Sequence, residues 1–268
     1  MKVEFSAFPK AFSGNVAVFV AADKQLLASA QTLDQQLGGA IGRAIAASRF
    51  TGAKGQTLTV LGQAGIDRLT LVGVGKAREL DARAAETLGG TLAGEANAAG
   101  LKDFAVWVDV VKGSRLTPGQ VAARIALGAR LRTYRFDKYK TKDKPEQKTS
   151  LVSVALHLAG AADGRRAYEK LEPTIDAVFF ARDLVSEPAN VLYPVEFARR
   201  AKELGRLGIK VEILGEAEMK KLGMHVLLGV GQGSERESQL LVMSYMKGPK
   251  SQKPVALVGK GVCFDTGG

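Results

Sequence analysis

The chain has 268 residues, of which 46% are hydrophobic and 24% charged, the balance of an ordinary soluble globular protein with room for more than one small domain. No run of about eighteen apolar residues occurs, and the short apolar run at 16–22 lacks a cleavage pattern, which argues against a transmembrane helix and a signal peptide. The single cysteine, Cys263, cannot form an internal disulfide. We therefore expect a cytoplasmic protein without a membrane partner.

The net charge of +11 is concentrated in the first part of the chain. Residues 1–170 hold 25 Lys/Arg against 15 Asp/Glu, whereas residues 171–268 hold 13 against 12. Much of the excess lies at 130–148, where aromatic rings alternate with basic side chains as in proteins that bind nucleic acids. A solvated linker between domains has a similar composition. We favour the linker and keep DNA binding as an alternative.

The first half alternates β-rich runs with helical patterns, which predicts an α/β domain. The predicted strands are 16–21, 57–61, 69–73 and 104–111. A four-residue spacing of apolar side chains predicts one helix through Leu33, Leu37, Ile41 and Ile45. An Ala-rich stretch predicts a second at 81–99. A third is expected at 118–131, with Thr117 as its N-cap and Pro118 in its first turn.

The second half is also predicted to be α/β. A strand is expected at 151–158, then one long helix from about 164 to Pro188, where proline interrupts the hydrogen-bond ladder. The remaining predicted elements are, in order, a helix at 194–207, a strand at 210–214, a short helix at 216–221, and strands at 239–245 and 255–258. This pattern predicts domain limits of 1–145 and 166–268, joined by a linker and first strand region at 146–165.

Three Gly-x-Gly sites lie beside predicted strands, at 73–75, 229–233 and 259–261. A dinucleotide fingerprint needs Gly-x-Gly-x-x-Gly at the start of a helix, and a phosphate-binding P-loop needs its lysine directly before Ser or Thr. None of the three sites meets either requirement. Nucleotide binding by these loops is therefore disfavoured.

The last fourteen residues pair an apolar run with reactive side chains. Val255–Val258 is followed by Gly259-Lys-Gly-Val-Cys-Phe-Asp265, and a glycine-rich turn at a strand end commonly meets a ligand. A lysine amine and a carboxylate held close together suit two divalent cations, because the amine binds a metal only when neutral and a carboxylate can bridge two ions. A surface lysine and a turn-capping aspartate fit the spacing equally well. Cys263 lacks a nearby base and is expected to be structural.

Residues 258–268 closely resemble the signature of the leucyl aminopeptidase family, Val-Gly-Lys-Gly-Ile-Thr-Phe-Asp-Ser/Thr-Gly-Gly, with only Val262 and Cys263 differing. The segments 181–192 and 222–234 also resemble family segments, in the same order. The resemblance implies an N-terminal macro-like mixed-sheet domain, followed by the beginning of a mixed-sheet catalytic domain. The segment 134–140, Tyr-Arg-Phe-Asp-Lys-Tyr-Lys, is likewise typical of the family.

In that family the residues matching Lys260 and Asp265 are metal ligands, the first to one ion and the second to both. The resemblance thus implies two divalent ions, manganese or zinc with magnesium as a further alternative, and release of N-terminal amino acids from peptides, leucine preferred. It also implies a homo-hexamer. The remaining ligands and the catalytic residues are expected after Gly268, so the 268-residue chain alone is expected to be inactive. The alternative is a basic N-terminal module that binds DNA or an ADP-ribose-type ligand.

Overall fold

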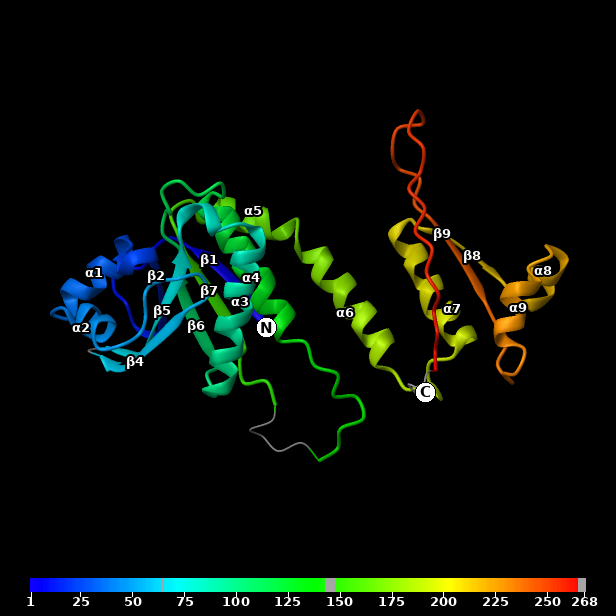
Figure 1. Cartoon of the computed structure of the whole chain (residues 1–268), viewed down its shortest axis with the longest axis horizontal. Helices are drawn as coiled ribbons and strands as arrows, with labels where there is room; N and C mark the ends of the chain where they lie inside the picture. Colours follow the sequence, from blue (N-terminus) through cyan, green and yellow to red (C-terminus); the bar gives the residue numbers. More distant parts are fainter. Residues whose placement is uncertain (64, 143–147, 265–268) are drawn as a thin grey trace. The chain divides into compact units, whose positions relative to one another are not determined.

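The computed structural model describes residues 1–63, 65–142 and 148–264. The chain forms two compact units, Met1–Phe180 and the residues from Ala181 onward (Figure 1). The predicted domain limits at residues 145 and 166 stay a prediction. None of the helices in the described part of the chain combines the length and the apolar character needed to cross a membrane.

A mixed seven-stranded sheet organises the first unit. Its order is β1-β7-β6-β2-β5-β4, with β3 added beside β2. The strands are β1 (Lys2–Ser6), β2 (Gly14–Ala21), β3 (Gln25–Leu26), β4 (Thr57–Gln63), β5 (Ile66–Gly75), β6 (Asp103–Trp107) and β7 (Ser153–His157). The five neighbouring strands β1, β7, β6, β2 and β5 run parallel to one another, whereas β3 and β4 are antiparallel to their partners. The mixed α/β class predicted from the sequence is confirmed.

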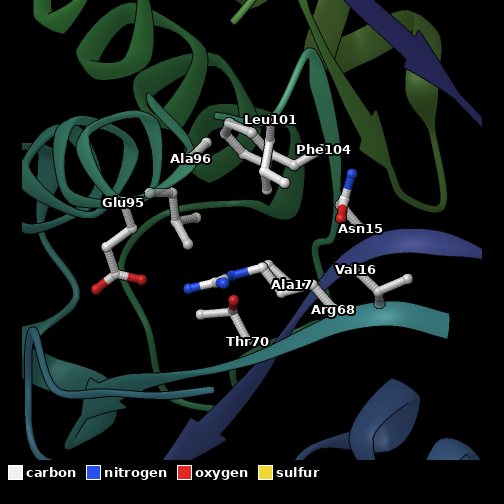
Figure 2. A pocket seen from close by; sticks show the side chains of 10 residues that line it. Asn15, Val16, Ala17, Arg68, Thr70, Glu95, Ala96, Leu101 and Phe104 are labelled. Atoms are coloured by element: carbon white, nitrogen blue, oxygen red, sulfur yellow. The ribbon is translucent and has the colours of Figure 1, made fainter. Parts of the chain in front are cut away.

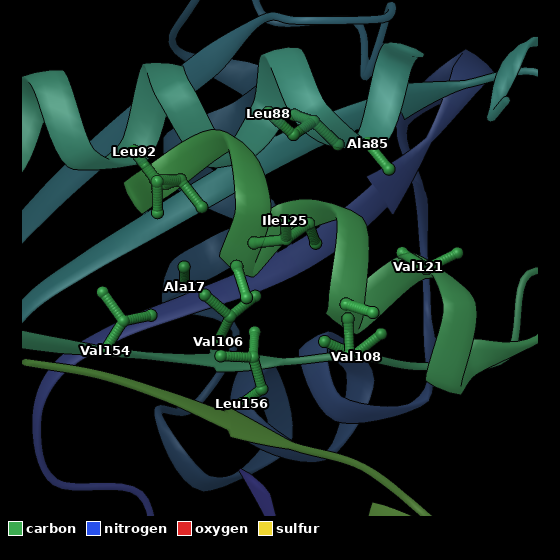
Figure 3. Packing of buried hydrophobic residues seen from close by; sticks show 14 of the residues in the cluster. Ala17, Ala85, Leu88, Leu92, Val106, Val108, Val121, Ile125, Val154 and Leu156 are labelled. Carbon is green, nitrogen blue, oxygen red and sulfur yellow. The ribbon is translucent and has the colours of Figure 1, made fainter. Parts of the chain in front are cut away.

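Helices cover both faces of this sheet (Figures 1 and 3). The α-helices that lie wholly within the first unit are α1 (Ala28–Gln36), α2 (Ala40–Ala46), α3 (Ala82–Ala98), α4 (Pro118–Arg132) and α5 (Ala161–Glu169). Along β2 the side chains alternate: Val16 and Val18 pack in the cluster with α1 and α2, while Ala17 and Phe19 pack in the cluster with α3 and α4. A central strand buried on both faces reads as a continuous apolar run, which explains why the sequence shows it clearly.

Helices α3 and α4 approach each other closely because glycines face the contact. A Cβ atom on Gly89 would lie 1.9 Å from the carbonyl oxygen of Ile125, and one on Gly128 would lie 1.8 Å from that of Glu86. Both helices begin at the predicted caps, with Asp81 accepting from the N–H of Ala84 and Thr117 from that of Gln120. The predicted helices at 81–99 and 118–131 are confirmed.

Two predictions of single long helices are wrong. The apolar face expected through Leu33 and Ile45 belongs to two helices, since Gly38 and Gly39 adopt positive φ and end α1 before α2 begins. The helix expected from 164 to 188 is also two, α5 and α6 (Glu172–Ser186). Pro173 has no N–H to continue the ladder, so it stands in the first turn of a new helix.

The strand predictions hold better in the first unit. Those at 16–21, 57–61, 69–73 and 151–158 correspond to β2, β4, β5 and β7, but β6 is shorter than the predicted 104–111. Strand β1 was not predicted. It has one buried side chain, Phe5, among five residues, which is a weak periodic signal.

The second unit is smaller and less buried. It contains α7 (Pro194–Lys202), a 3₁₀ turn (Glu203–Leu207), β8 (Lys210–Leu214), α8 (Glu216–Lys221), α9 (His225–Gly231) and β9 (Leu240–Ser244). Strands β8 and β9 form a two-stranded antiparallel sheet. The buried apolar side chains of this unit, among the described residues, are Leu192, Ala198, Ala201 and Met219. The predicted elements at 210–214, 216–221 and 239–245 are confirmed. The single helix predicted at 194–207 is an α-helix only as far as Lys202, and the 3₁₀ turn follows it.

Candidate metal centre

The chain after β9 is extended and exposed. Val255, Leu257 and Val258 are 88%, 94% and 99% exposed, and no described residue of 251–264 belongs to a strand. The strand predicted at 255–258 is therefore wrong for this structure. A strand needs a neighbour for its backbone groups, and β9 pairs only with β8 among the described strands.

Lys260 lies in this exposed stretch between two glycines. Neither Gly259 nor Gly261 adopts positive φ, and no atom lies within 4 Å of where a Cβ would stand on either. The tight glycine turn expected around Lys260 is thus not formed in this structure. The amine is solvent-exposed, and no ion pair is found for it among the described residues.

Asp265, the second predicted ligand, lies outside the described residues. Among residues 1–63, 65–142 and 148–264 no group of three or more His, Cys, Asp or Glu side chains could hold a metal. An amine and a carboxylate are both suitable ligands for a divalent ion. Two ligands are too few for a pair of ions, because such a pair needs several protein ligands. The assignment of Lys260 and Asp265 as metal ligands stays a prediction.

Cys263 lies within this motif and is half-buried. Its Sγ is 3.9 Å from the carbonyl oxygen of Gly261, and partial burial raises the pKa of the Cys263 thiol. A raised pKa favours the thiol over the thiolate, so the side chain is unsuited to nucleophilic catalysis. Of the two histidines, His157 forms a hydrogen bond of 2.8 Å between its Nδ1 and the hydroxyl of Ser6 in the first unit. His225 is exposed at the start of α9.

A charged cluster that the sequence analysis missed orders the segment before α7. The side chain of Glu187 is only 3% exposed and pairs with Arg200 at 3.0 Å. Arg200 also bonds to Glu196 at 2.8 Å, and Arg199 bonds to Glu196 at 2.6 Å. These hydrogen bonds, first from Arg199 and then from Arg200, lower the pKa of Glu196 to about 2. The i, i+3 and i, i+4 spacing on α7 is the signal that could have revealed the pairing of Glu196 with Arg199 and Arg200.

The glycine motif at 229–233 was expected beside a strand, but most of it lies in a helix. Gly229 and Gly231 belong to helix α9, and the chain then folds back toward α8, where the N–H of Ser238 donates to Glu216 at 2.8 Å. The guanidinium of Arg236 lies 4.3 Å from the ring centre of Tyr193. The loop after α9 is thereby held to two other parts of the second unit.

Two family models match the chain, and they describe parts of one protein family. Residues 17–143 match "Cytosol aminopeptidase family, N-terminal domain", and residues 179–268 match "Cytosol aminopeptidase family, catalytic domain". The chain belongs to the cytosol aminopeptidase family. The family assignment made from the sequence motifs is confirmed. Lys260 and Asp265 both lie within the part matched by the catalytic-domain model.

Comparisons with individual proteins agree with this result. A probable cytosol aminopeptidase of Caulobacter vibrioides is 45% identical over 273 residues, covering 100% of this chain and 54% of the relative. A mutant of tomato leucine aminopeptidase has the same fold, with a TM-score of 0.81 at 23% identity over 100% of this chain and 55% of the other. The bottromycin maturation enzyme BotP in complex with Mn is 25% identical, with a TM-score of 0.61 over 88% of this chain and 45% of that one. The chain spans about half the length of the curated relatives it matches.

The alternative of an ADP-ribose-type ligand is not favoured by the contacts at the carboxyl ends of β2 and β6. In α/β sheets ligands bind beyond the carboxyl ends of the parallel strands. Here β3 folds back on the end of β2, and a Cβ on Gly52 would lie 2.0 Å from the carbonyl oxygen of Ala21. Asp109, just after β6, accepts both the N–H and the hydroxyl of Ser29, at 3.0 and 2.8 Å. At the carboxyl ends of β2 and β6, these positions are therefore taken by contacts within the protein.

The DNA-binding alternative is also disfavoured by the pairing of the basic segment. Arg135 and Lys140 both pair with Asp137, and Lys138 lies 5.3 Å from the ring centre of Tyr139. Arg130 lies 4.0 Å from Glu172. These charges are partly neutralised within the protein, and residues 143–147 of the segment lie outside the described part of the chain.

Proposed function

We propose that the complete protein is a metal-dependent aminopeptidase that releases N-terminal amino acids from peptides. The single observation that carries the proposal is the match of residues 179–268 to the catalytic domain of the cytosol aminopeptidase family, because this part contains the Lys260 and Asp265 motif. The names of the relatives support the reaction class. The preference for leucine rests on the sequence resemblance and on the name of the tomato structure.

Lys260 and Asp265 are the residues of this chain that would hold the ions. When bound, a pair of divalent ions activates the scissile carbonyl and a water molecule. Lys260 contributes a neutral amine donor, and Asp265 contributes the negative charge that offsets the two cations. The identity of the ions as manganese or zinc is part of the proposal, and the BotP structure that contains Mn supports manganese. Further ligands would come from the part of the relatives that this chain does not span.

The same proposal includes the oligomeric state, the cellular location and the domain limits of the enzyme. Family resemblance supports a homo-hexamer in the cytoplasm, which agrees with relatives named cytosol aminopeptidases. It also supports a macro-like domain over residues 1–145 and a catalytic part from residue 166.

The experiment uses the full-length protein and a leucine amide substrate with a chromogenic leaving group. We expect hydrolysis that is lost after removal of metal with a chelator and restored by manganese or zinc. An N-acetylated form of the substrate is the matched control, because an aminopeptidase requires a free amino group. Equal cleavage of both substrates, or full activity in the metal-free protein, would contradict the proposal.

A further inference from the structure

A small cavity lies between the C-terminal half of α3 and the starts of β2 and β5 (Figure 2). Its apolar walls include Ala17, Leu92 and Phe104, and its polar groups include Arg68 and Glu95. The room for the centre of a water-sized sphere is about 20 Å³. One water molecule needs about 10–15 Å³ on that measure, so the cavity holds a single small molecule.

Glu95 presents a buried oxygen to this cavity. Its Oε1 accepts a hydrogen bond of 2.6 Å from the hydroxyl of Thr57 on β4. Its Oε2 is buried and has no hydrogen-bond partner among the described residues. A carboxylate oxygen removed from water without a partner is unfavourable, so a donor is expected at this position.

Arg68 places a cation on the opposite wall. Strand register puts Arg68 beside Asn15, and Thr70 beside Ala17, on the face of the sheet that α3 covers. Figure 2 shows the guanidinium pointing toward the side of the cavity where Glu95 lies. One of its nitrogens is 3.4 Å from the hydroxyl of Thr59, a long hydrogen bond. No ion pair within 4.0 Å joins Arg68 to Glu95 among the described contacts.

We propose that one ordered water molecule occupies this cavity, donating to Oε2 of Glu95 and accepting from the guanidinium of Arg68. The occupant must donate on one side and accept on the other, and water does both. A metal or ammonium ion would meet the positive charge of Arg68, and an anion would meet the negative charge of Glu95. The cavity is too small for a larger neutral molecule.

The water would complete the attachment of the C-terminal half of α3 to the sheet. On one side, Asn97 accepts from the N–H groups of Ser150 and Leu151, both at 3.0 Å, just before β7. On the other side, Glu95 is joined to β4 through Thr57. A bridge to Arg68 adds β5, so two strands and the segment that leads into β7 would be tied to one end of this helix.

A crystal structure of the full chain at about 1.5 Å resolution tests the proposal directly. We expect one density peak within about 2.6–3.2 Å of both Oε2 of Glu95 and a guanidinium nitrogen of Arg68. A direct ion pair between Glu95 and Arg68, or a cavity without a peak, would overturn it.

Variants separate the water site from helix stability. Glu95→Leu should remove the density peak and lower Tm by about 2–4 °C. Arg68→Met should also remove the peak, and it is the variant to use if Glu95→Leu does not fold. Glu86→Leu is the matched control on α3, because Glu86 pairs directly with Arg124 and not with the cavity; it should leave the peak in place. A peak that persists unchanged in Glu95→Leu or in Arg68→Met would overturn the bridge.

Discussion

The two units differ in how completely their own residues bury their apolar side chains. In the first unit, both faces of the sheet are covered, and side chains such as Phe19, Leu71 and Ile125 are fully buried. In the second, Val226 is 89% exposed and Met246 69%, and the motif with Lys260 follows in an extended stretch. The first unit is therefore held by its own packing, whereas Lys260, one of the two residues proposed to bind metal, lies in an exposed stretch. Substitutions should accordingly separate into effects on chemistry and effects on folding.

The largest effect is expected for Lys260→Ala in the full-length protein. Loss of the only amine in the motif should abolish peptidase activity and weaken one of two metal sites, with little change in folding because the side chain is exposed. Titration calorimetry with manganese measures both sites. Lys253→Ala, an exposed lysine of the same segment, is the control and should behave as the wild type. Equal metal stoichiometry and affinity in both variants would exclude Lys260 as a ligand.

Asp265→Asn tests the companion carboxylate. The amide keeps the shape but loses the charge that offsets two cations, so metal content and turnover should both fall while the thermal unfolding curve of the metal-free protein is unchanged. Metal content is measured by elemental analysis after gel filtration. Retention of both metals with near-normal turnover would show that Asp265 is only a turn residue.

Gly128→Ala should have the opposite signature, an effect on folding without one on metal affinity. The added methyl group would meet the carbonyl oxygen of Glu86, and overpacking of this kind costs about 1–3 kcal/mol. Gly90→Ala is a matched control in α3, since its methyl group would lie 3.7 Å from the nearest atom and should raise helix stability by up to about 1 kcal/mol. Urea unfolding measures both. Equal stability of the two variants would mean that α3 and α4 are not packed this closely.

The smallest effect concerns pH and compares Glu196 in the second unit with Asp109 in the first. The pKa of Glu196 is lowered from 4.5 to about 2, so its contribution to stability is present above about 4.5 and is lost as pH falls toward 2. Burial raises the pKa of Asp109 in spite of the hydrogen bonds from Ser29, so its contribution has the opposite sign and declines as pH rises through the raised value. Carboxyl ¹³C NMR titration measures each pKa. Two ordinary values would show that neither environment is formed in solution.

Most of the first unit could be predicted from the sequence because its strands and helices carry strong periodic signals. Strand β2 is apolar on both faces, and α3 and α4 begin at capping residues whose spacing is recognisable. The errors occurred where one or two residues overrule a longer pattern: Gly38 and Gly39 divide one apolar face, and Pro173 restarts a helix.

For the candidate site, the sequence could predict the protein family but not the conformation. The motif at 258–268 identifies the family through residue identities, which do not depend on the conformation of this stretch. Its geometry could not be predicted, because a strand at 255–258 and a turn around Lys260 both require neighbours that the described residues do not provide. The buried pair of Glu187 and Arg200 was missed because its residues are thirteen positions apart and belong to no repeating pattern.

The most direct test of the central claim is anomalous diffraction from crystals of the full-length protein soaked in manganese. We expect two anomalous peaks about 3.5–4 Å apart, one of them bound by the amine of Lys260 and both of them contacted by the carboxylate of Asp265. Peaks at other side chains, with Lys260 and Asp265 facing solvent, would contradict the assignment of this motif as the metal centre.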